Sequence, residues 1–401
     1  PPSFGTVIAR ALRHLSMDIA MSDDAIVAPP GAEETLRAMV SETAESSELY
    51  RPSQFWKDLN QINQAMLDEL GLQNLKRTLA QNYFNWLITS DKDPQYRSVR
   101  RHWMRHPTLQ PYLNRLETPT LLQTLQPYLS KLENSSVPLA AMGPAPRIGA
   151  RELKVYKLFV GMLWEYATQQ DWSGIADRTY EPLVGNPIVL TRRGRLISQD
   201  LANSIREYNA ILSDARELSH TPKRVAELGA GYGRLGHVFL CDNNSKYCIF
   251  DIPPALYASQ WYLGTAHPGR KVFGFRKFRD FSEIADELER SDVAFFTPNQ
   301  IEFFPDGYFD VFASISTLPE MTAPQIENYL RQAERLAKRY IYLKQWLDWE
   351  NPADGHRVTA DTMQLGAGWA TVFDRKDAVQ PQFFERLWRS KNFQVQSGPH
   401  T

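Results

Sequence analysis

The sequence of 401 residues has only two cysteines, Cys241 and Cys248, and almost no net charge. Two thiols are too few for a disulfide framework or a zinc site built from thiolates, and both suit buried apolar positions. A formal net charge of −1 gives no general electrostatic reason to bind nucleic acid or an anionic membrane, because such binding needs clustered positive charge. No His or carboxylate cluster has convincing metal-ligand spacing, so we expect no metal.

Long hydrophobic runs are also absent. No apolar stretch approaches the roughly 20 residues that span a bilayer, and the N-terminus lacks the roughly 7 to 15 apolar residues of a signal-peptide core. We therefore expect a cytoplasmic protein without a membrane partner. A hydrophobic fraction of 43% is nevertheless ample for the cores of two or three domains. The composition leaves a homo-oligomer open.

The first half of the chain has a helical pattern. Four segments carry apolar residues at helical spacing: 33–46, 52–70, 75–87 and 151–170. Ser53 is placed to cap the second segment, and a Pro, Gly and Ala-rich stretch at 134–150 predicts a connection. We expect a helical N-terminal domain over residues 1–200 that covers an acceptor site, followed by an α/β domain over residues 201–401.

From Thr221 onward, predicted strands alternate with helices, the pattern of a doubly wound parallel sheet. The predicted strands are 224–228, 246–250, 272–276, 293–297, 309–314 and 340–345. Ligands of such sheets bind outside the carboxyl ends of the strands, so the residues that end each strand are candidates for a site. Among them are Gly229 to Gly233, Asp251, Asn299, Gln300 and Ser316 to Glu320.

The most informative motif is Glu227-Leu-Gly-Ala-Gly-Tyr-Gly-Arg234, at the end of the first of these strands. Gly229, Gly231 and Gly233 let the backbone turn sharply and approach a ligand without an intervening Cβ. Asp251 ends the next strand, roughly 20 residues further on, where a carboxylate can accept hydrogen bonds from both ribose hydroxyls. The pattern predicts a nucleotide-like cofactor.

The same glycines also satisfy the dinucleotide fingerprint, in which a pyrophosphate sits on a helix N-terminus. Glu227 argues against a pyrophosphate, which it would repel, and favours the cationic aminoacyl end of S-adenosylmethionine. A nicotinamide or flavin nucleotide, and a glycine-rich turn without a ligand, are the alternatives. Tyr232 and Ile252, beside the glycines and Asp251, join the candidate cofactor contacts.

Motifs outside this loop extend the comparison to a family. They lie at 50–56, 76–86, 185–187, 198–204, 226–234, 319–321, 342–346 and 382–385. With these motifs the chain resembles a bacterial family of sugar O-methyltransferases, which are class I enzymes dependent on S-adenosylmethionine. The resemblance implies a Rossmann-like class I methyltransferase domain, S-adenosylmethionine as cofactor, and a small-molecule substrate, namely a sugar or glycoside.

Two features depart from the usual class I pattern. Residues 293–300 stand where many of these enzymes carry an acid that binds the adenine amine, so Asn299 or Gln300 would have to accept that hydrogen bond through a side-chain carbonyl. The interval 271–292 adds a strand and a helix. Gln199 and Ser316 complete the predicted cofactor contacts.

Methylation of an alcohol requires a group that takes the hydroxyl proton. Glu320, in the loop after the strand at 309–314, and His356, in a polar loop, are the candidate bases. The alternatives are a helix N-terminal Glu favoured by the helix dipole and a solvated loop His. His237, on the helix after the glycines, is interpreted as a packing residue.

Aromatic residues follow the last predicted strand. Trp346, Trp349 and Trp369 either stack on the apolar face of a sugar or fill the core. Two rival functions stay open. One is methylation of a carboxylate or another small acceptor, which needs no general base, and the other is a non-catalytic scaffold that keeps the cofactor pocket.

Overall fold

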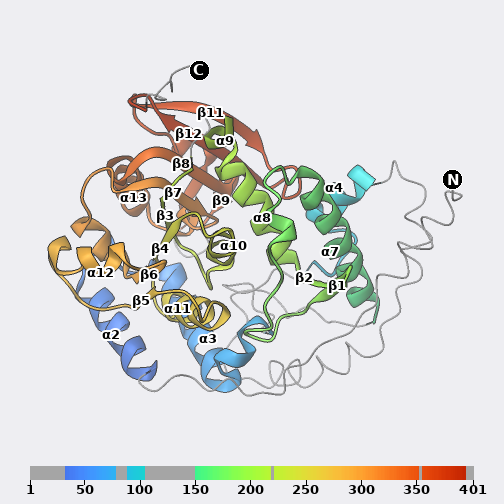
Figure 1. The fold of residues 1–401 in the computed structure, drawn as a ribbon, viewed down its shortest axis with the longest axis horizontal. Helices are drawn as coiled ribbons and strands as arrows, with labels where there is room; N and C mark the ends of the chain where they lie inside the picture. Colours follow the sequence, from blue (N-terminus) through green and yellow to red (C-terminus); the bar gives the residue numbers. More distant parts are fainter. Residues whose placement is uncertain (1–31, 78–87, 104–149, 218–220, 352–354, 394–401) are drawn as a thin grey trace, which may run out of the picture. The chain divides into compact units, whose positions relative to one another are not determined.

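The computed structural model describes residues 32–77, 88–103, 150–217, 221–351 and 355–393 (Figure 1). The described chain forms two compact units. The first contains the described residues of Ile62–Arg206 and of Ala378–Pro381, and the second contains those up to Gln61, those of Glu207–Asp377 and those from Gln382 onward. The helical segments before Gln61 thus group with the sheet. The connection predicted at 134–150 lies outside the described residues except for its last residue.

The first unit is mainly helical within the described residues. Its elements include η1 (Leu72–Arg77), α4 (Pro94–Trp103), α7 (Ala150–Gln170), η3 (Ile175–Asp177), β1 (Leu190–Arg192) and β2 (Arg195–Ile197). The two short strands form an antiparallel hairpin that the sequence pattern did not predict. Two helices run from one unit into the other, α3 (Gln54–Leu70) and α8 (Gln199–Ile211).

The cap predicted at Ser53 is confirmed, and Ser198 caps a second helix in the same way. The backbone N–H of Trp56 donates to Ser53 Oγ (3.4 Å) at the start of α3, and that of Leu201 donates to Ser198 Oγ (3.0 Å) at the start of α8. A side-chain oxygen at each N-cap thereby satisfies a backbone donor that has no partner within its helix.

The second unit is built on an eight-stranded sheet with the order β11-β12-β8-β7-β3-β4-β6-β5. Its strands are β3 (Arg224–Leu228), β4 (Lys246–Phe250), β5 (Val272–Phe273), β6 (Val293–Phe296), β7 (Phe309–Ile315), β8 (Ala337–Trp346), β11 (Trp369–Lys376) and β12 (Phe383–Ser390). The pairs from β5 to β8 are parallel, whereas β12 runs antiparallel to both β8 and β11. The doubly wound α/β fold is therefore confirmed, with an antiparallel hairpin at one edge.

Helices and short strands complete this unit. They are α2 (Ala32–Glu45), α9 (Ser213–Glu217), α10 (Arg234–Asp242), α11 (Ala255–Ala266), η4 (Phe281–Glu283), α12 (Ala285–Glu289), η5 (Pro298–Phe303), η6 (Leu318–Glu320), α13 (Ala323–Leu336), β9 (Asp348–Glu350), β10 (Arg357–Thr359) and η7 (Ala360–Thr362). The extra strand predicted at 272–276 is only the two-residue edge strand β5, and the helix predicted after it is α12. Strands β9 and β10 form a small hairpin.

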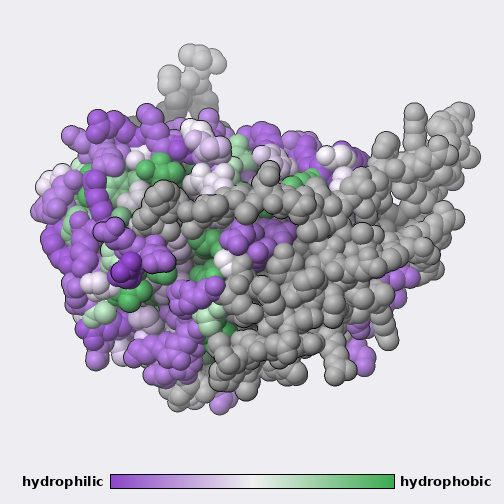
Figure 2. Space-filling model, turned by 90° about the horizontal axis from the view of Figure 1, so that it is seen from below, coloured by the Kyte–Doolittle hydropathy of each residue, from purple (hydrophilic) through white to green (hydrophobic). Residues whose placement is uncertain are grey.

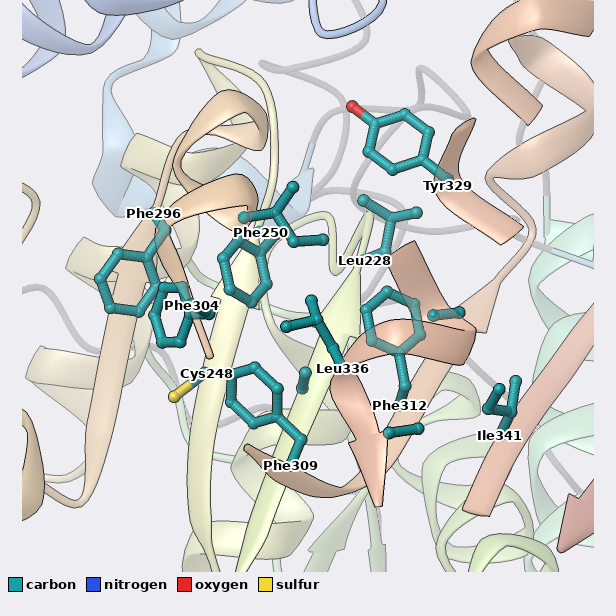
Figure 3. Packing of buried hydrophobic residues seen from close by; sticks show 14 of the residues in the cluster. Leu228, Cys248, Phe250, Phe296, Phe304, Phe309, Phe312, Tyr329, Leu336 and Ile341 are labelled. Atoms are coloured by element: carbon teal, nitrogen blue, oxygen red, sulfur yellow. The ribbon is translucent and has the colours of Figure 1, made fainter. Parts of the chain in front are cut away.

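Both faces of the central strands are buried, which explains their continuous apolar sequences. Ala226 and Leu228 of β3 belong to a cluster that also includes Leu336 of α13. Figure 3 shows the aromatic part of this cluster, where the rings of Phe250 and Phe296 stack at 5.3 Å. On the opposite face, Tyr247 meets the ring of Phe239 on α10, 5.1 Å away. Alternate residues of each strand thus pack into two hydrophobic cores, one on each face of the sheet.

The described residues on the face seen in Figure 2 are mostly hydrophilic. Figure 2 shows hydrophobic residues in small areas between larger hydrophilic ones. Among the residues that the structure describes, the exposed large hydrophobic ones are Val40, Trp172, Tyr180 and Val272. Within the described ranges, no helix has both the length and the apolar character needed to cross a bilayer.

Candidate functional site

The order of the sheet defines where a ligand of this fold would bind. Strands β4, β6 and β5 lie on one side of β3, and β7, β8, β12 and β11 lie on the other. The chain therefore reverses direction across the sheet between β3 and β7, and the carboxyl ends of these two strands flank the crevice where doubly wound sheets bind ligands. The glycine loop follows β3, and Ser316 to Glu320 follow β7.

The glycine loop has the backbone that its sequence predicts. Gly229, Gly231 and Gly233 have φ values of 73°, 60° and 88°, in the left-handed region where a Cβ is unfavourable. A Cβ on Gly229 would lie 2.2 Å from Oγ1 of Thr317, in the loop after β7. The Thr317 hydroxyl also donates to the Gly229 carbonyl at 3.2 Å. The absence of a side chain thus lets the two loops touch.

Asp251 stands at the end of β4 and holds the glycine loop directly. Its Oδ2 accepts a hydrogen bond from Gly231 N (2.9 Å), and its Oδ1 accepts one from Ile252 N (2.7 Å). Burial raises the pKa of Asp251 to about 7, although these backbone donors favour the ionised form. Each carboxylate oxygen has a second lone pair, so the group can still accept hydrogen bonds from a ligand.

Glu227, the acid before the glycines, is buried inside the sheet. Its Oε2 accepts a hydrogen bond from the Tyr247 hydroxyl at 2.7 Å, and burial raises its pKa to about 7. A carboxyl group that is only partly ionised near neutral pH repels a pyrophosphate less than the sequence argument assumed. The ring of Tyr232 is also buried and packs edge-on against Tyr262, so the loop offers a ligand its backbone at this position rather than the ring.

The two residues proposed to bind the adenine amine differ in their hydrogen bonding. Gln300 is fully buried, its Oε1 accepts from Thr297 N (3.1 Å), and its Nε2 donates to the Arg276 carbonyl (2.8 Å). Asn299 donates from Nδ2 to Oε1 of Glu42 (2.7 Å), while its Oδ1 is buried and has no hydrogen-bond partner among the described residues. An unsatisfied buried acceptor is costly unless a donor reaches it.

Glu42 of α2 fixes the orientation of this amide, because a carboxylate can accept hydrogen bonds but cannot donate them. Arg279 donates to both of its oxygens, at 2.6 and 3.0 Å. Burial alone would raise the pKa of Glu42, but the hydrogen bonds from Arg279 and Asn299 lower it overall. An ionised Glu42 requires the Nδ2 group of Asn299 to face it, which turns Oδ1 away.

Glu320 ends η6 and presents the least satisfied carboxyl group of this region. Its Oε2 is buried without a hydrogen-bond partner in the described part of the chain, and its main-chain carbonyl accepts from Ser53 Oγ at 2.8 Å. Burial raises the pKa of Glu320 well above its usual value, the Trp56 side chain lowers it through a hydrogen bond, and the negative charge of Asp251 raises it further. The two carboxyl groups therefore lie within electrostatic range of each other.

Aromatic rings of the same unit surround the end of β8. The ring of Trp349 lies 5.0 Å from that of Trp346 and 6.4 Å from that of Phe55, which contacts Trp56 at 5.7 Å. The indole Nε1 of Trp349 is buried and has no hydrogen-bond partner within the described ranges. Trp369, in contrast, packs against the hydrophobic core from β11.

The other predicted site residues lie as follows. The main-chain carbonyl of His356 accepts a hydrogen bond from Asn351 N (2.8 Å). The side chain of Asn351 donates from Nδ2 to the main-chain carbonyl of Glu320 (3.4 Å). Both candidate bases are thus on segments that contact Asn351. Ser316 has a left-handed φ of 55°, an uncommon conformation for a residue other than glycine. Gln199 is buried at the start of α8, in the first unit.

Two side chains at this site escaped the sequence analysis. Glu42 and Trp56 stand in the helical segments before residue 61, far in sequence from the strand ends that guided the search. The motif at 50–56 marked Trp56 as part of a resemblance without giving it a role. Nothing in the local pattern of α2 distinguishes Glu42 from Glu45, which is exposed and pairs with Lys277.

Comparison with solved structures yields remote matches. A SAM-dependent methyltransferase from Aquifex aeolicus has 14% sequence identity, with 44% of this chain and 88% of that chain covered and a TM-score of 0.27. The 1,6-didemethyltoxoflavin-N1-methyltransferase of Burkholderia thailandensis has 15% identity, with 47% and 78% covered and a TM-score of 0.30. No protein-family model and no curated protein matches the chain.

Proposed function

We propose that the protein is an enzyme that transfers a methyl group from S-adenosylmethionine to a hydroxyl of a sugar or a sugar-bearing metabolite. The observation that carries the proposal is a buried, incompletely satisfied carboxyl group, Glu320, within electrostatic range of Asp251 beside the glycine loop. A candidate nucleotide-binding loop and a candidate base thus lie near each other in the same unit. This pairing is what methyl transfer to an alcohol requires.

The residues at this edge suit the proposed cofactor. Asp251 would accept hydrogen bonds from the ribose hydroxyls, and the glycine backbone would allow close approach. The buried Oδ1 of Asn299 needs a donor, and the adenine amine is one. When bound, S-adenosylmethionine supplies a methyl group already activated by its sulfonium.

The acceptor side is inferred from Glu320 and the aromatic cluster around Trp349. With Trp56 donating to its carboxylate, Glu320 keeps Oε2 for the acceptor hydroxyl, whose proton it would take. The Trp349 ring offers a surface for the apolar face of a sugar, and its Nε1–H can donate to a sugar oxygen. These groups favour a polyhydroxylated acceptor over a simple carboxylate.

Calorimetry distinguishes the two candidate cofactors, S-adenosylmethionine and a nicotinamide dinucleotide. S-adenosylhomocysteine should bind, and NAD should not. Tight binding of NAD without a response to S-adenosylhomocysteine would contradict the proposal. The dinucleotide alternative deserves this direct comparison because the electrostatic argument from Glu227 is weakened by a pKa of about 7.

A screen of sugars and glycosides, followed by variants, tests the acceptor. Glu320→Gln should lower turnover by about 10²-fold to 10⁴-fold with unchanged affinity for S-adenosylhomocysteine. Trp349→Phe, which keeps a stacking ring, should retain more activity than Trp349→Ala, and Trp172→Ala, at an exposed tryptophan of the first unit, is the control. Full activity in both Glu320→Gln and His356→Asn would favour carboxylate methylation. Cofactor binding without turnover of any acceptor would favour a scaffold.

A further inference from the structure

Two histidines and a cysteine converge between α10 and the end of α11. His237 and Cys241 lie one turn apart on α10, and His267 is the C-cap of α11. One potential ligand atom from each of the three side chains lies within 4.8 Å of the other two. Nδ1 of His237 is 2.8 Å from Nε2 of His267, and Nε2 of His237 is 3.8 Å from Sγ of Cys241.

We propose that His237, Cys241 and His267 form a zinc site. Imidazole nitrogen and thiolate sulfur are the ligands that zinc prefers, and three protein ligands leave a fourth tetrahedral position for water. Zn–N bonds of about 2.0 Å and Zn–S bonds of about 2.3 Å place tetrahedral ligand atoms about 3.3 to 3.7 Å apart. His237 can give an ion only one of its two ring nitrogens. With one atom taken from each side chain, the three potential ligand atoms lie within 4.8 Å of one another, so shifts of about 1 Å would bring them to these separations.

The surroundings permit such an ion. His237 is buried, whereas Cys241 and His267 are partly exposed, which gives an ion a route to the cluster. Arg270 is the cation near His267, but its guanidinium donates to the Leu240 carbonyl (2.5 Å) and to the Asn243 side chain. A Cys241 thiolate would offset part of the charge of the metal.

A metal at this place would join two helices that connect successive strands of the sheet. The backbone N–H of His237 donates to the Gly233 carbonyl at 3.0 Å, so His237 stands one helical turn from the glycine loop. Zinc would thus hold α10 to α11 and stabilise the fold around that loop. The inference does not depend on the methyl acceptor or on the identity of the nucleotide.

The test uses the full chain with any affinity tag removed, because histidine tags bind zinc. Elemental analysis of the purified protein should find about one zinc per chain. After chelation, zinc should rebind and raise the melting temperature, and Co²⁺ should give a thiolate charge-transfer band. Cys241→Ser should remove that band and weaken zinc binding at least about tenfold, the lower range reported for losing even an outer-shell partner. Cys248→Ala should keep both properties.

His267→Gln provides a second variant at a partly exposed position, so the test does not depend on the folding of a single mutant. It should also weaken zinc binding at least about tenfold. Wild-type protein that binds no zinc after chelation would overturn the proposal. Equal zinc affinity in the wild type, Cys241→Ser and His267→Gln would overturn it as well, because the metal would then be bound elsewhere.

Discussion

Lowering the pH from about 7 to about 5 should weaken binding of S-adenosylhomocysteine by about fifty-fold if Asp251 holds the ribose. Burial raises the pKa of Asp251 from 3.8 to about 7 in the free protein. Hydrogen bonds from two ribose hydroxyls favour the carboxylate and should return the pKa of the bound form toward 3.8. Binding therefore releases a proton below about pH 7, and acid opposes it.

The magnitude follows from these two pKa values. The apparent association constant is proportional to the ionised fraction of free Asp251, which is about one half at pH 7 and about one hundredth at pH 5. A bound form with a pKa of 3.8 stays ionised over most of this range. The ratio of about fifty corresponds to about 2.3 kcal/mol.

Calorimetry of wild-type protein and Asp251→Asn at several pH values checks this expectation. The variant should bind more weakly at pH 7 by about 1.5 to 3 kcal/mol, the range for hydrogen bonds to a charged group, and should lose the pH dependence. Glu45→Gln is the control, since Glu45 is an exposed carboxylate of the same unit that pairs with Lys277. It should keep the dependence. An affinity of the wild type that does not change with pH, or an equal change in Asp251→Asn, would refute the reasoning.

Three further outcomes are expected. Gly231→Val should abolish cofactor binding, whereas Gly307→Val should destabilise the fold without affecting binding. Gly307 has a similar φ of 63°, and an added Cβ would make only an ordinary contact there, with Lys338 Cβ at 3.9 Å. Glu42→Gln should weaken S-adenosylhomocysteine binding about twofold to tenfold because the Asn299 amide loses its fixed orientation, and Glu45→Gln on the same helix should not. Activity should rise with pH because Glu320 must ionise to act as a base and its pKa is raised; the rise should disappear from the residual activity of Glu320→Gln.

The central strands could be predicted because each of them is a short run of consecutive apolar residues. Strands β3 and β4 have the predicted bounds, since parallel strands covered on both faces have unbroken apolar sequences. The glycine loop and Asp251 followed from these strand ends. Their parallel pairing, with Leu228 opposite Phe250, brings the two ends together as the sequence argument required.

The antiparallel hairpin could not be predicted in the same way. Strand β11 is an edge strand without a fully buried residue, and its last three residues, Asp374 to Lys376, are charged. Strand β12 contains Glu385 and Arg386, both buried. Glu385 accepts from the Tyr342 hydroxyl (3.0 Å) and pairs with Arg375, while Arg386 pairs with Asp374. Buried charges whose partners lie on other segments of the chain make the sequence of an inner strand resemble a surface loop.

The local sequence could not distinguish Asn299 from Gln300 as the residue that accepts a hydrogen bond from the adenine amine. Both offer a carbonyl at the end of β6, and the sequence left them equivalent. Gln300 is engaged by its own capping box, a local contact, whereas Asn299 is oriented by Glu42, 257 positions away in the sequence. The same holds for Glu320, which depends on Trp56 and Ser53. Strand ends predict which residues lie near the ligand, but the partners that leave one oxygen unsatisfied come from helices α2 and α3 and become visible only in the folded chain.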